Sequence, residues 1–367
     1  MFQSSKTPLA CAGAAIVAAV TSSLPANGQQ ASTDELPPVV VMQDAPSAST
    51  APAKKTTSSP AGSATPGTVA SGPETLSETA PGATGLAVPL TTTRLKREQI
   101  QSRSPATADT ARLLQSVPGV SVYQGGGVSA LPVINGLNDD RVKVLIDGKA
   151  ITSACGNHMN PPLSYIAPSQ VASAEVIAGV TPVSKGGDSL GGTVVIDSAA
   201  PEFASNGERV ITSGSISAYY RSNGDGIGFS GNARAATRNV SVEYAGSWSK
   251  ADNYARGEDG PDVLSTLYQS TNHALTLTAR DGEDLYVVQS SYQAIPYQGY
   301  VNQRMDMVDN KAWMFSVRAL THHDWGILDA RAFYHQTDHE MNILEDKQPG
   351  EMPMLTEGMD AGYAVTA

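Results

Sequence analysis

The stretch Asn239–Lys250 reads NVSVEYAGSWSK and alternates between two kinds of residue. One set is Val240, Val242, Tyr244, Gly246 and Trp248, and the residues between them are Ser241, Glu243, Ala245, Ser247 and Ser249. Because successive side chains of a β-strand point to opposite faces, the stretch predicts a strand with one apolar and one polar face. Its length suits a strand that crosses an outer membrane, which needs roughly 9–11 residues.

Weaker alternation continues on both sides of this stretch, in segments joined by short turns. The segments are 209–221, 226–238, 273–281, 284–293, 312–320 and 325–344. Aromatic residues stand near the segment ends, as in the interfacial girdles of outer-membrane barrels. A soluble β-sandwich shows the same alternation. The unbroken series of hairpins, together with an export signal, favours a transmembrane antiparallel β-barrel.

The export signal lies at the N-terminus. Lys6 precedes an apolar run from Leu9 to Val20, and Ala26-Asn27-Gly28 supplies the small residues of a cleavage site. The run is too short for a spanning helix, which needs about 20 apolar residues, and no later stretch approaches that length. We therefore predict that residues 1–28 are a signal peptide.

Residues 29–86 are rich in Ala, Pro, Ser, Thr and Gly and predict a flexible linker. One apolar run interrupts it, Pro38-Val39-Val40-Val41-Met42. Proline holds such a segment extended, and its β-branched residues suit adding a strand to the sheet edge of another protein. From the residues alone, a chance apolar patch in a disordered tail is an equal alternative.

Residues 87–202 predict a compact α+β unit, and residues 203–367 the strands of the barrel. In the α+β unit a short capped helix follows Asp109 and ends at Pro118-Gly119. Its predicted strands are Val120–Tyr123, Leu131–Ile134, Val142–Ile146 and Glu175–Ala178.

The composition excludes several function classes. The 367 residues carry a formal net charge of −11, which argues against a nucleic-acid partner. The sequence shows no nucleophile–base set, no paired carboxylates and no phosphate-binding loop, so we expect neither an enzyme nor an organic cofactor. Cys11 lies in the signal, and Cys155 is then the one cysteine left, which cannot form an internal disulfide.

Cys155 begins a loop with unusual chemistry, Cys155-Gly156-Asn157-His158-Met159. A thiol, an imidazole and a thioether stand within five residues. Thiolate and thioether are soft ligands that suit Cu(I) far better than Mg, Ca or Mn. In the alternative interpretation Cys155 is a small buried hydrophobe and Met159 fills a gap in a core.

A second candidate pair lies on the segment 325–344. If no bulge interrupts this strand, His339 and Met341 share a phase with Asp329, Arg331 and His335. That polar phase is the lumen side of a barrel, so both side chains would point toward a plug loop. Either residue could instead simply line the wall.

Further methionines stand in segments predicted as loops, and they are weaker candidates for the same chemistry. They are Met305, Met307, Met352 and Met354. Weak thioether contacts there could pass copper inward, or the four residues could be incidental.

The order of signal, Val-rich run, linker, α+β unit and hairpins resembles TonB-dependent outer-membrane receptors. Three strings are similar to the plug of that family, in the family's order: Asp109–Val122 (DTARLLQSVPGVSV), Asn138–Ile151 (NDDRVKVLIDGKAI) and Glu175–Ile177 with Gly186–Gly192. One departure is Asn135-Gly136, where many plugs carry Arg-Gly.

The resemblance implies an α+β plug inside a barrel of about 22 strands. Only about eight strands can be recognised here, so the sequence is expected to be a truncated receptor. The resemblance also implies that Pro38–Met42 is the TonB box. The expected partners are then the TonB energy-transducing complex and the lipid of a Gram-negative outer membrane, with no oligomer.

Within this family, the copper receptors carry Cys-x-x-x-Met on the plug and His-x-Met on the barrel, and Cys155/Met159 and His339/Met341 match both motifs. The resemblance therefore implies a Cu(I) site with one ligand pair from each domain and copper as the transported substrate. His158 is a weaker candidate, expected beside the site or at the surface. A siderophore or haem receptor, or a copper-binding surface protein that does not transport, remains the alternative.

Overall fold

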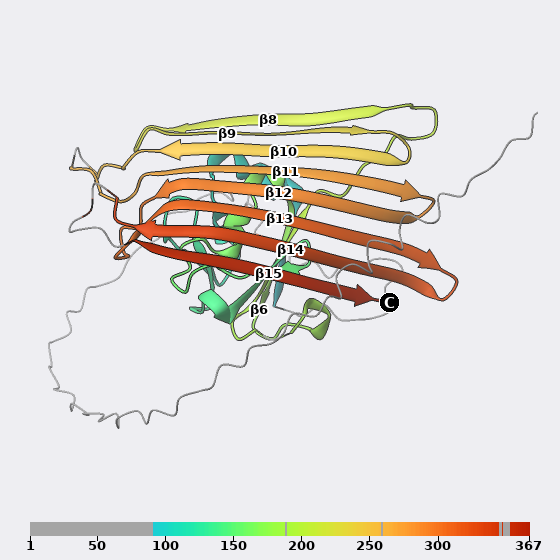
Figure 1. Ribbon diagram of the computed structural model, residues 1–367, viewed down its shortest axis with the longest axis horizontal. Helices are drawn as coiled ribbons and strands as arrows, with labels where there is room; N and C mark the ends of the chain where they lie inside the picture. The colour runs from blue at the N-terminus through green and yellow to red at the C-terminus, as the bar shows by residue number, and fades with distance from the viewer. Residues whose placement is uncertain (1–90, 188, 258–259, 345–346, 348–352) are drawn as a thin grey trace, which may run out of the picture. The chain divides into compact units, whose positions relative to one another are not determined.

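Two bodies of secondary structure follow one another along the chain, a small mixed unit and a long antiparallel sheet (Figure 1). The computed structural model describes residues 91–187, 189–257, 260–344, 347 and 353–367. The predicted signal peptide, the predicted TonB box Pro38–Met42 and Met352 lie outside the described residues.

The small unit has a five-stranded sheet in the order β1-β6-β7-β4-β5, in which β4 and β7 are parallel and the other pairs antiparallel. Its strands are β1 (Thr92–Leu95), β4 (Val142–Ile146), β5 (Lys149–Ala150), β6 (Val171–Ala178) and β7 (Gly192–Ser198), beside the hairpin of β2 (Val120–Tyr123) and β3 (Leu131–Ile134). Its helices are α1 (Arg97–Gln101), η2 (Ser104–Ala106), η3 (Thr110–Ser116), η4 (Asp139–Arg141), η5 (Pro162–Tyr165), η6 (Pro168–Gln170) and η7 (Val183–Lys185). No helix in the described part of the chain is long and apolar enough to cross a membrane.

The carboxylate of Asp109 organises the start of η3, as the sequence predicts for a cap. It accepts hydrogen bonds from Ala111 N at 3.0 Å and from Ala130 N at 3.1 Å, and it therefore ties the helix to the loop between β2 and β3. Asp109 is 2 % exposed, and this burial raises its pKa to about 6 although Arg112 opposes the shift.

The long sheet has eight strands, each paired with its neighbours in sequence. They are β8 (Ile211–Arg221), β9 (Gly226–Ala236), β10 (Val240–Ala251), β11 (Tyr268–Asp281), β12 (Asp284–Gln298), β13 (Asp306–His323), β14 (Gly326–Asn342) and β15 (Met354–Thr366). The first seven correspond to the predicted segments, whereas β1, β5, β7 and β15 are strands that were not predicted from the sequence.

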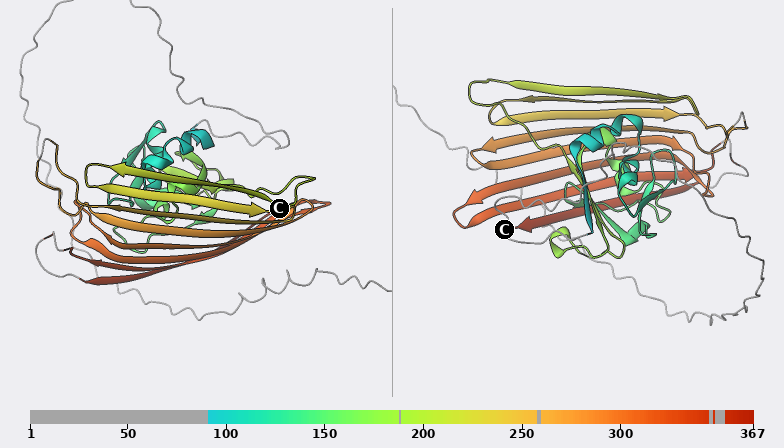
Figure 2. Two further views of the ribbon diagram at one scale, coloured as in Figure 1. Left: turned by 90° about the horizontal axis from the view of Figure 1, so that it is seen from above. Right: turned by 180° about the vertical axis from the view of Figure 1, so that it is seen from behind.

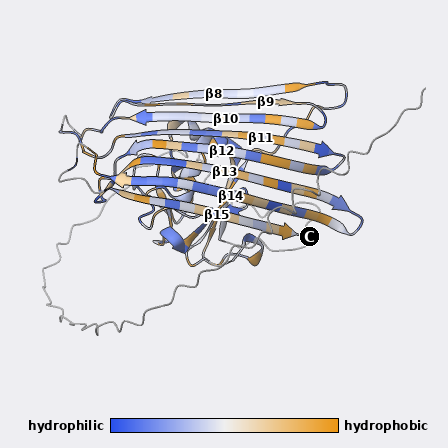
Figure 3. Ribbon diagram, in the orientation of Figure 1, coloured by the Kyte–Doolittle hydropathy of each residue, from blue (hydrophilic) through white to orange (hydrophobic). Residues whose placement is uncertain are grey.

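Burial along these strands distinguishes a membrane barrel from a sandwich. The apolar phase of β10 and β13 is exposed, with Tyr244 at 46 % and Trp313 at 58 %, whereas polar Ser241 and Asn310 are buried. A soluble sandwich would bury the apolar phase instead. Apolar residues outward and polar residues inward are the pattern of a lipid-facing barrel wall. Figure 3 shows hydrophobic and hydrophilic residues mixed along the strands of the sheet.

The outward face of β13 changes character along the strand. Trp313 packs on Tyr292 of β12 with ring centroids 4.3 Å apart. From Trp313 toward the C-terminal end of β13, which pairs with the start of β14, apolar side chains such as Phe315 and Val317 follow on the same face. On the other side of Trp313 the outward residues are polar: Lys311 pairs with Asp309 at 2.5 Å, and Asp338 of β14 is exposed. The apolar belt therefore ends at Trp313.

The small unit packs on the polar face of the long sheet (Figure 2). One contact region, which we call the Asp147 junction, is charged. Arg331 of β14 donates from Nη1 to the carbonyl of Asp147 at 3.3 Å and pairs with Asp329 at 2.5 Å. Lys149 donates to Gln289 of β12 at 2.8 Å. Gly148 has φ +75°, and a Cβ there would clash with Arg331.

Candidate metal centre

The predicted plug ligands lie in a tight loop between β5 and η5. His158 N donates to Cys155 O at 3.0 Å and His158 has φ +49°, so the chain turns back between Cys155 and Met159. Asn160 follows at once and donates from Nδ2 to Gln293 Oε1 of β12 at 2.9 Å. Cys155 is 7 % exposed and Met159 fully buried, so the loop presents both sulfur atoms to the interior.

Cys155 and Met159 pack with methionines of the long sheet and its loops. The buried residues of this cluster that carry sulfur are Cys155, Met159, Met305, Met307 and Met341. We call these five residues the sulfur cluster. Ile295 and Tyr300, both fully buried, pack with these five residues, so apolar side chains surround much of the cluster.

His339 lies two residues before Met341 on the same face of β14, as the alternation predicts. His339 and Met341 are 2 % and 1 % exposed. The inward side chains of His335 and Thr337 precede them on the same face, and Gln336 and Asp338, on the opposite face, are exposed. His339 Nδ1 lies 2.9 Å from Asn310 Oδ1, but Nε2 has no hydrogen-bond partner. A buried nitrogen without a partner costs stability, and an unused imidazole lone pair is what a metal ligand offers.

The segment between β12 and β13 holds two of the methionines in place. Tyr300 donates its hydroxyl hydrogen to the carbonyl of Met159, and burial raises the pKa of Tyr300, which keeps it a neutral donor. Asp306, fully buried between Met305 and Met307, accepts from Tyr300 N and from Lys347 Nζ, each at 2.8 Å. The carboxylate is thus occupied in anchoring the two methionines.

A glycine loop of the plug completes the wall of the site. At Gly127 a Cβ would clash with the ring of Tyr268, and at Gly126 it would lie 2.6 Å from Gln298 Nε2. Gln298 Oε1 in turn accepts from Val128 N at 2.9 Å. Only glycine allows the plug backbone to approach β11 and β12 this closely.

The remaining predicted residues take different positions. His158 Nε2 lies 3.7 Å from Asp140 Oδ2, so its ring contacts η4 of the plug. Met354 pairs in register with Met341 but is 45 % exposed. The prediction that Met307 and Met354 lie in loops is wrong, because β13 and β15 include them. Met305 does precede β13 in a loop.

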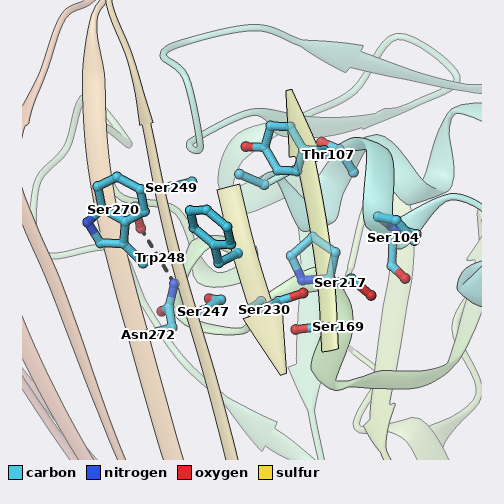
Figure 4. A pocket seen from close by; sticks show the side chains of 16 residues that line it. Ser104, Thr107, Ser169, Ser217, Ser230, Ser247, Trp248, Ser249, Ser270 and Asn272 are labelled. Carbon is cyan, nitrogen blue, oxygen red and sulfur yellow. Dashed lines mark hydrogen bonds between the residues drawn. The ribbon is translucent and has the colours of Figure 1, made fainter. Parts of the chain in front are cut away.

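A small hollow of about 20 Å³ lies between plug and sheet, apart from the sulfur cluster (Figure 4). Its walls are mostly hydroxyl-bearing, with Ser217, Ser230, Ser247 and Ser270 from four successive strands. Its lining contains no His, Cys, Met or carboxylate, and its volume suits about one water molecule. It offers no metal ligands.

Hard-ligand chemistry does not account for the sulfur cluster either. Among the residues that the structure describes, no three His, Cys, Asp or Glu side chains gather where they could hold a metal ion.

A mixed plug unit on the polar face of an antiparallel sheet whose apolar face is turned outward defines a plugged outer-membrane barrel. Residues 85–193 match the family model described as TonB-dependent Receptor Plug Domain. The chain thus contains a TonB-dependent receptor plug domain, followed by strands that align with part of such a receptor's barrel. Receptors of this kind are transporters without enzymatic activity and reside in the outer membrane of Gram-negative bacteria.

Solved structures agree on the fold. The structure described as copper transporter OprC is 21% identical, has a TM-score of 0.67 and is matched over 75% of this chain and 43% of its own. A ferric enterobactin receptor (PfeA) variant from Pseudomonas aeruginosa is 16% identical (TM-score 0.56; 74% and 45% covered). The FrpB iron transporter from Neisseria meningitidis is 14% identical (TM-score 0.56; 73% and 43% covered).

The chain thus spans less than half the length of these structures. A comparison with curated proteins finds no significant match.

Proposed function

We propose that this chain belongs to a TonB-dependent receptor that imports copper, with Cu(I) as the transported substrate. Cys155 and Met159 of the plug and His339 and Met341 of β14 are its proposed ligands. The observation that carries the proposal is the sulfur cluster itself, in which buried sulfur-bearing side chains of plug and barrel pack together. His339, whose buried Nε2 has no hydrogen-bond partner, lies two residues before Met341 of this cluster on β14.

Charge balance favours a monovalent soft ion. A Cys155 thiolate contributes one negative charge, which Cu(I) neutralises, and the thioethers and a neutral imidazole add none. Asp306, the carboxylate between Met305 and Met307, is already paired with Lys347. A hard divalent ion would find neither the oxygen ligands nor the second negative charge that it requires.

The division of ligands between plug and barrel supports a transport role. A metal that bridges the two bodies binds their assembled state in preference to any state with the plug displaced. Copper would therefore stabilise the closed receptor, and energy delivered through the proposed TonB box Pro38–Met42 would be needed to separate the ligand pairs. Met305 and Met307 would add thioether contacts along the way.

The fold itself does not select the substrate, since the similar structures include iron and enterobactin receptors. A ferric siderophore would call for aromatic and arginine side chains at its site, whereas the plug loop that packs on the long sheet carries Cys155 and Met159. A copper-binding surface protein that does not transport has no use for a plug domain, which this chain contains.

The test is metal analysis of the outer-membrane protein that carries this sequence, purified after exposure to copper under reducing conditions. We expect about one copper ion per chain, and far less in Cys155→Ser, which keeps the side-chain volume but replaces a soft donor by a hard one. Met314→Leu serves as the control, because Met314 is a buried β13 methionine outside the sulfur cluster. Equal copper in both variants, or none in the unaltered protein, would contradict the proposal.

A further inference from the structure

We propose that Gln293 and Asn310 are positioning residues that fix the tautomer of His339, and that the seated plug sets their orientation. The inference rests on the proposed function, because it concerns how His339 presents a lone pair to the sulfur cluster. It adds two residues of the barrel wall that neither ligand motif includes.

A carbonyl of the plug backbone determines which atoms of the network donate and which accept. Gln293 Nε2 donates to the carbonyl of Ser164, which can only accept. The amide of Gln293 is thereby oriented, and its Oε1 must be an acceptor. This oxygen receives Asn160 Nδ2 from the plug at 2.9 Å and Asn310 Nδ2 from β13 at 3.3 Å.

The same logic passes from Asn310 to the imidazole. Since Asn310 Nδ2 donates to Gln293, Asn310 Oδ1 is an acceptor, and it lies 2.9 Å from His339 Nδ1. His339 therefore carries its hydrogen on Nδ1, and Nε2 keeps a free lone pair. The opposite tautomer would set two acceptors against each other and leave a buried N–H unpaired, which is unfavourable.

The network is sealed from water, so bulk solvent cannot take over either role. Asn310 is fully buried, and Gln293, Asn160 and His339 are each 1–2 % exposed. A hydrogen bond to the second nitrogen of a ligating histidine orients the ring and raises its basicity. These amides thus prepare Nε2 for a metal before any ion arrives.

Both plug contacts of Gln293, Ser164 O and Asn160 Nδ2, leave with the plug. Gln293 Nε2 then keeps one acceptor, Asn272 Oδ1 of β11 at 3.3 Å, so the orientation of the Gln293 amide and the polarity of Asn310 are held less tightly. Displacement of the plug would weaken the barrel's half of the site as well as removing Cys155 and Met159. Release of the ion would follow from plug movement without any change in the ligands' own chemistry.

The experiment measures the tautomer directly, in copper-free receptor labelled with 15N-histidine. The His339 signals are assigned by their loss in His339→Gln. We expect the Nδ1–H tautomer in the unaltered protein and its loss in Gln293→Leu and in Asn310→Leu. Asn310→Asp restores an acceptor for Nδ1–H and should retain it. Asn232→Leu is the control, since the Asn232 side-chain oxygen accepts from Ser215 of β8.

Copper affinity is measured on the same proteins. Gln293→Leu and Asn310→Leu should bind Cu(I) about 10- to 100-fold more weakly. This is the usual effect of removing the hydrogen-bond partner of the histidine nitrogen that does not bind the metal. Asn310→Asp and Asn232→Leu should stay near the unaltered value. An Nε2–H tautomer of His339 in the unaltered protein overturns the inference. So do Leu variants that keep both tautomer and affinity. An Nδ1–H tautomer in a receptor that binds no copper supports the inference and contradicts the proposed function.

Discussion

Two of the places where the plug meets β14 are built from opposite chemistry. At the sulfur cluster the contact is dry and made of thioethers, a thiol and neutral amides. At the Asp147 junction it is made of ion pairs and charged hydrogen bonds. His339 and Arg331 are eight residues apart on one strand, or roughly 27 Å.

The difference separates two tasks of one interface. The charges of the Asp147 junction already have partners, since Arg331 pairs with Asp329 and Lys149 with Asp147, so this contact is complete without a ligand. Near the sulfur cluster, by contrast, Nε2 of His339 has no hydrogen-bond partner, and in our proposal an incoming cation completes the site. The Asp147 junction therefore needs no ligand to hold the seated plug, whereas we expect the sulfur cluster to hold the plug more tightly once a cation is bound.

The largest effect is expected from removing thioethers at the sulfur cluster. Met159→Leu combined with Met341→Leu conserves volume, so the fold should lose less than about 1.5 kcal/mol per site. Loss of a group that hydrogen-bonds a metal ligand typically lowers metal affinity about 10- to 100-fold, and loss of a ligand itself should cost at least as much. Removing two ligands should therefore lower Cu(I) affinity on the order of 1,000-fold. Competition titration with a Cu(I) chelator measures it, with Met314→Leu as control. Unchanged affinity in the double variant would exclude these methionines as ligands.

The next effect concerns pH. The Asp109 carboxyl supports, through Ala130, the loop that packs on the sulfur side, and burial raises its pKa to about 6. The folded state then favours the protonated form, so its stabilising contribution is present below pH 4 and is lost as the pH rises through about 6. The rise of the Asp109 pKa from 3.8 to about 6 corresponds to ~3 kcal/mol of unfolding free energy.

Unfolding measured between pH 3.5 and 7.5 tests this sign. Stability should fall with rising pH across that window in the unaltered protein and much less in Asp109→Asn, which cannot titrate. Parallel pH profiles for the two proteins would mean that Asp109 is not the group responsible.

A smaller effect is expected at the charged end. Gly148→Ala forces a side chain into positive φ and against Arg331, which should cost about 1–2 kcal/mol of stability. Because the sulfur cluster lies roughly 27 Å away along β14, Cu(I) affinity should stay within about twofold. Gly136→Ala is matched to it, since Gly136 also has positive φ but its Cβ would meet no neighbour. A large loss of copper in Gly148→Ala alone would show that the two junctions are not independent.

Strand alternation was enough to predict much of the sheet and the inward direction of His339. β14 runs without a register shift through Met341 in its pairing with β15, so a period of two holds to the ligand pair. In β13 the same rule fails. The register shifts between Met307 and Asp309, and this irregularity turns Met307 inward although strict alternation groups it with outward Lys311 and Trp313. A sequence carries no local sign of that shift.

The missed strands have equally physical reasons. β7 is buried on both faces, so Val194, Val195 and Ile196 show no alternation to detect. In β15 the inward positions include Gly358 and Gly362, which weaken the contrast between the two phases. The amide network could not be predicted at all, because Asn160, Gln293 and Asn310 meet only through tertiary packing.

The polar outward residues beyond Trp313 have a consequence for how the site stays dry. His339 and Asn310 pair at a level where Lys311 and Asp338 face outward, past the end of the apolar belt. Water is kept from the sulfur cluster there by plug and loop side chains, not by hydrocarbon. A change in bilayer thickness acts on the apolar belt, where mismatch tilts strands or thins the lipid. The exclusion of water from the site then depends on the protein and not on the bilayer.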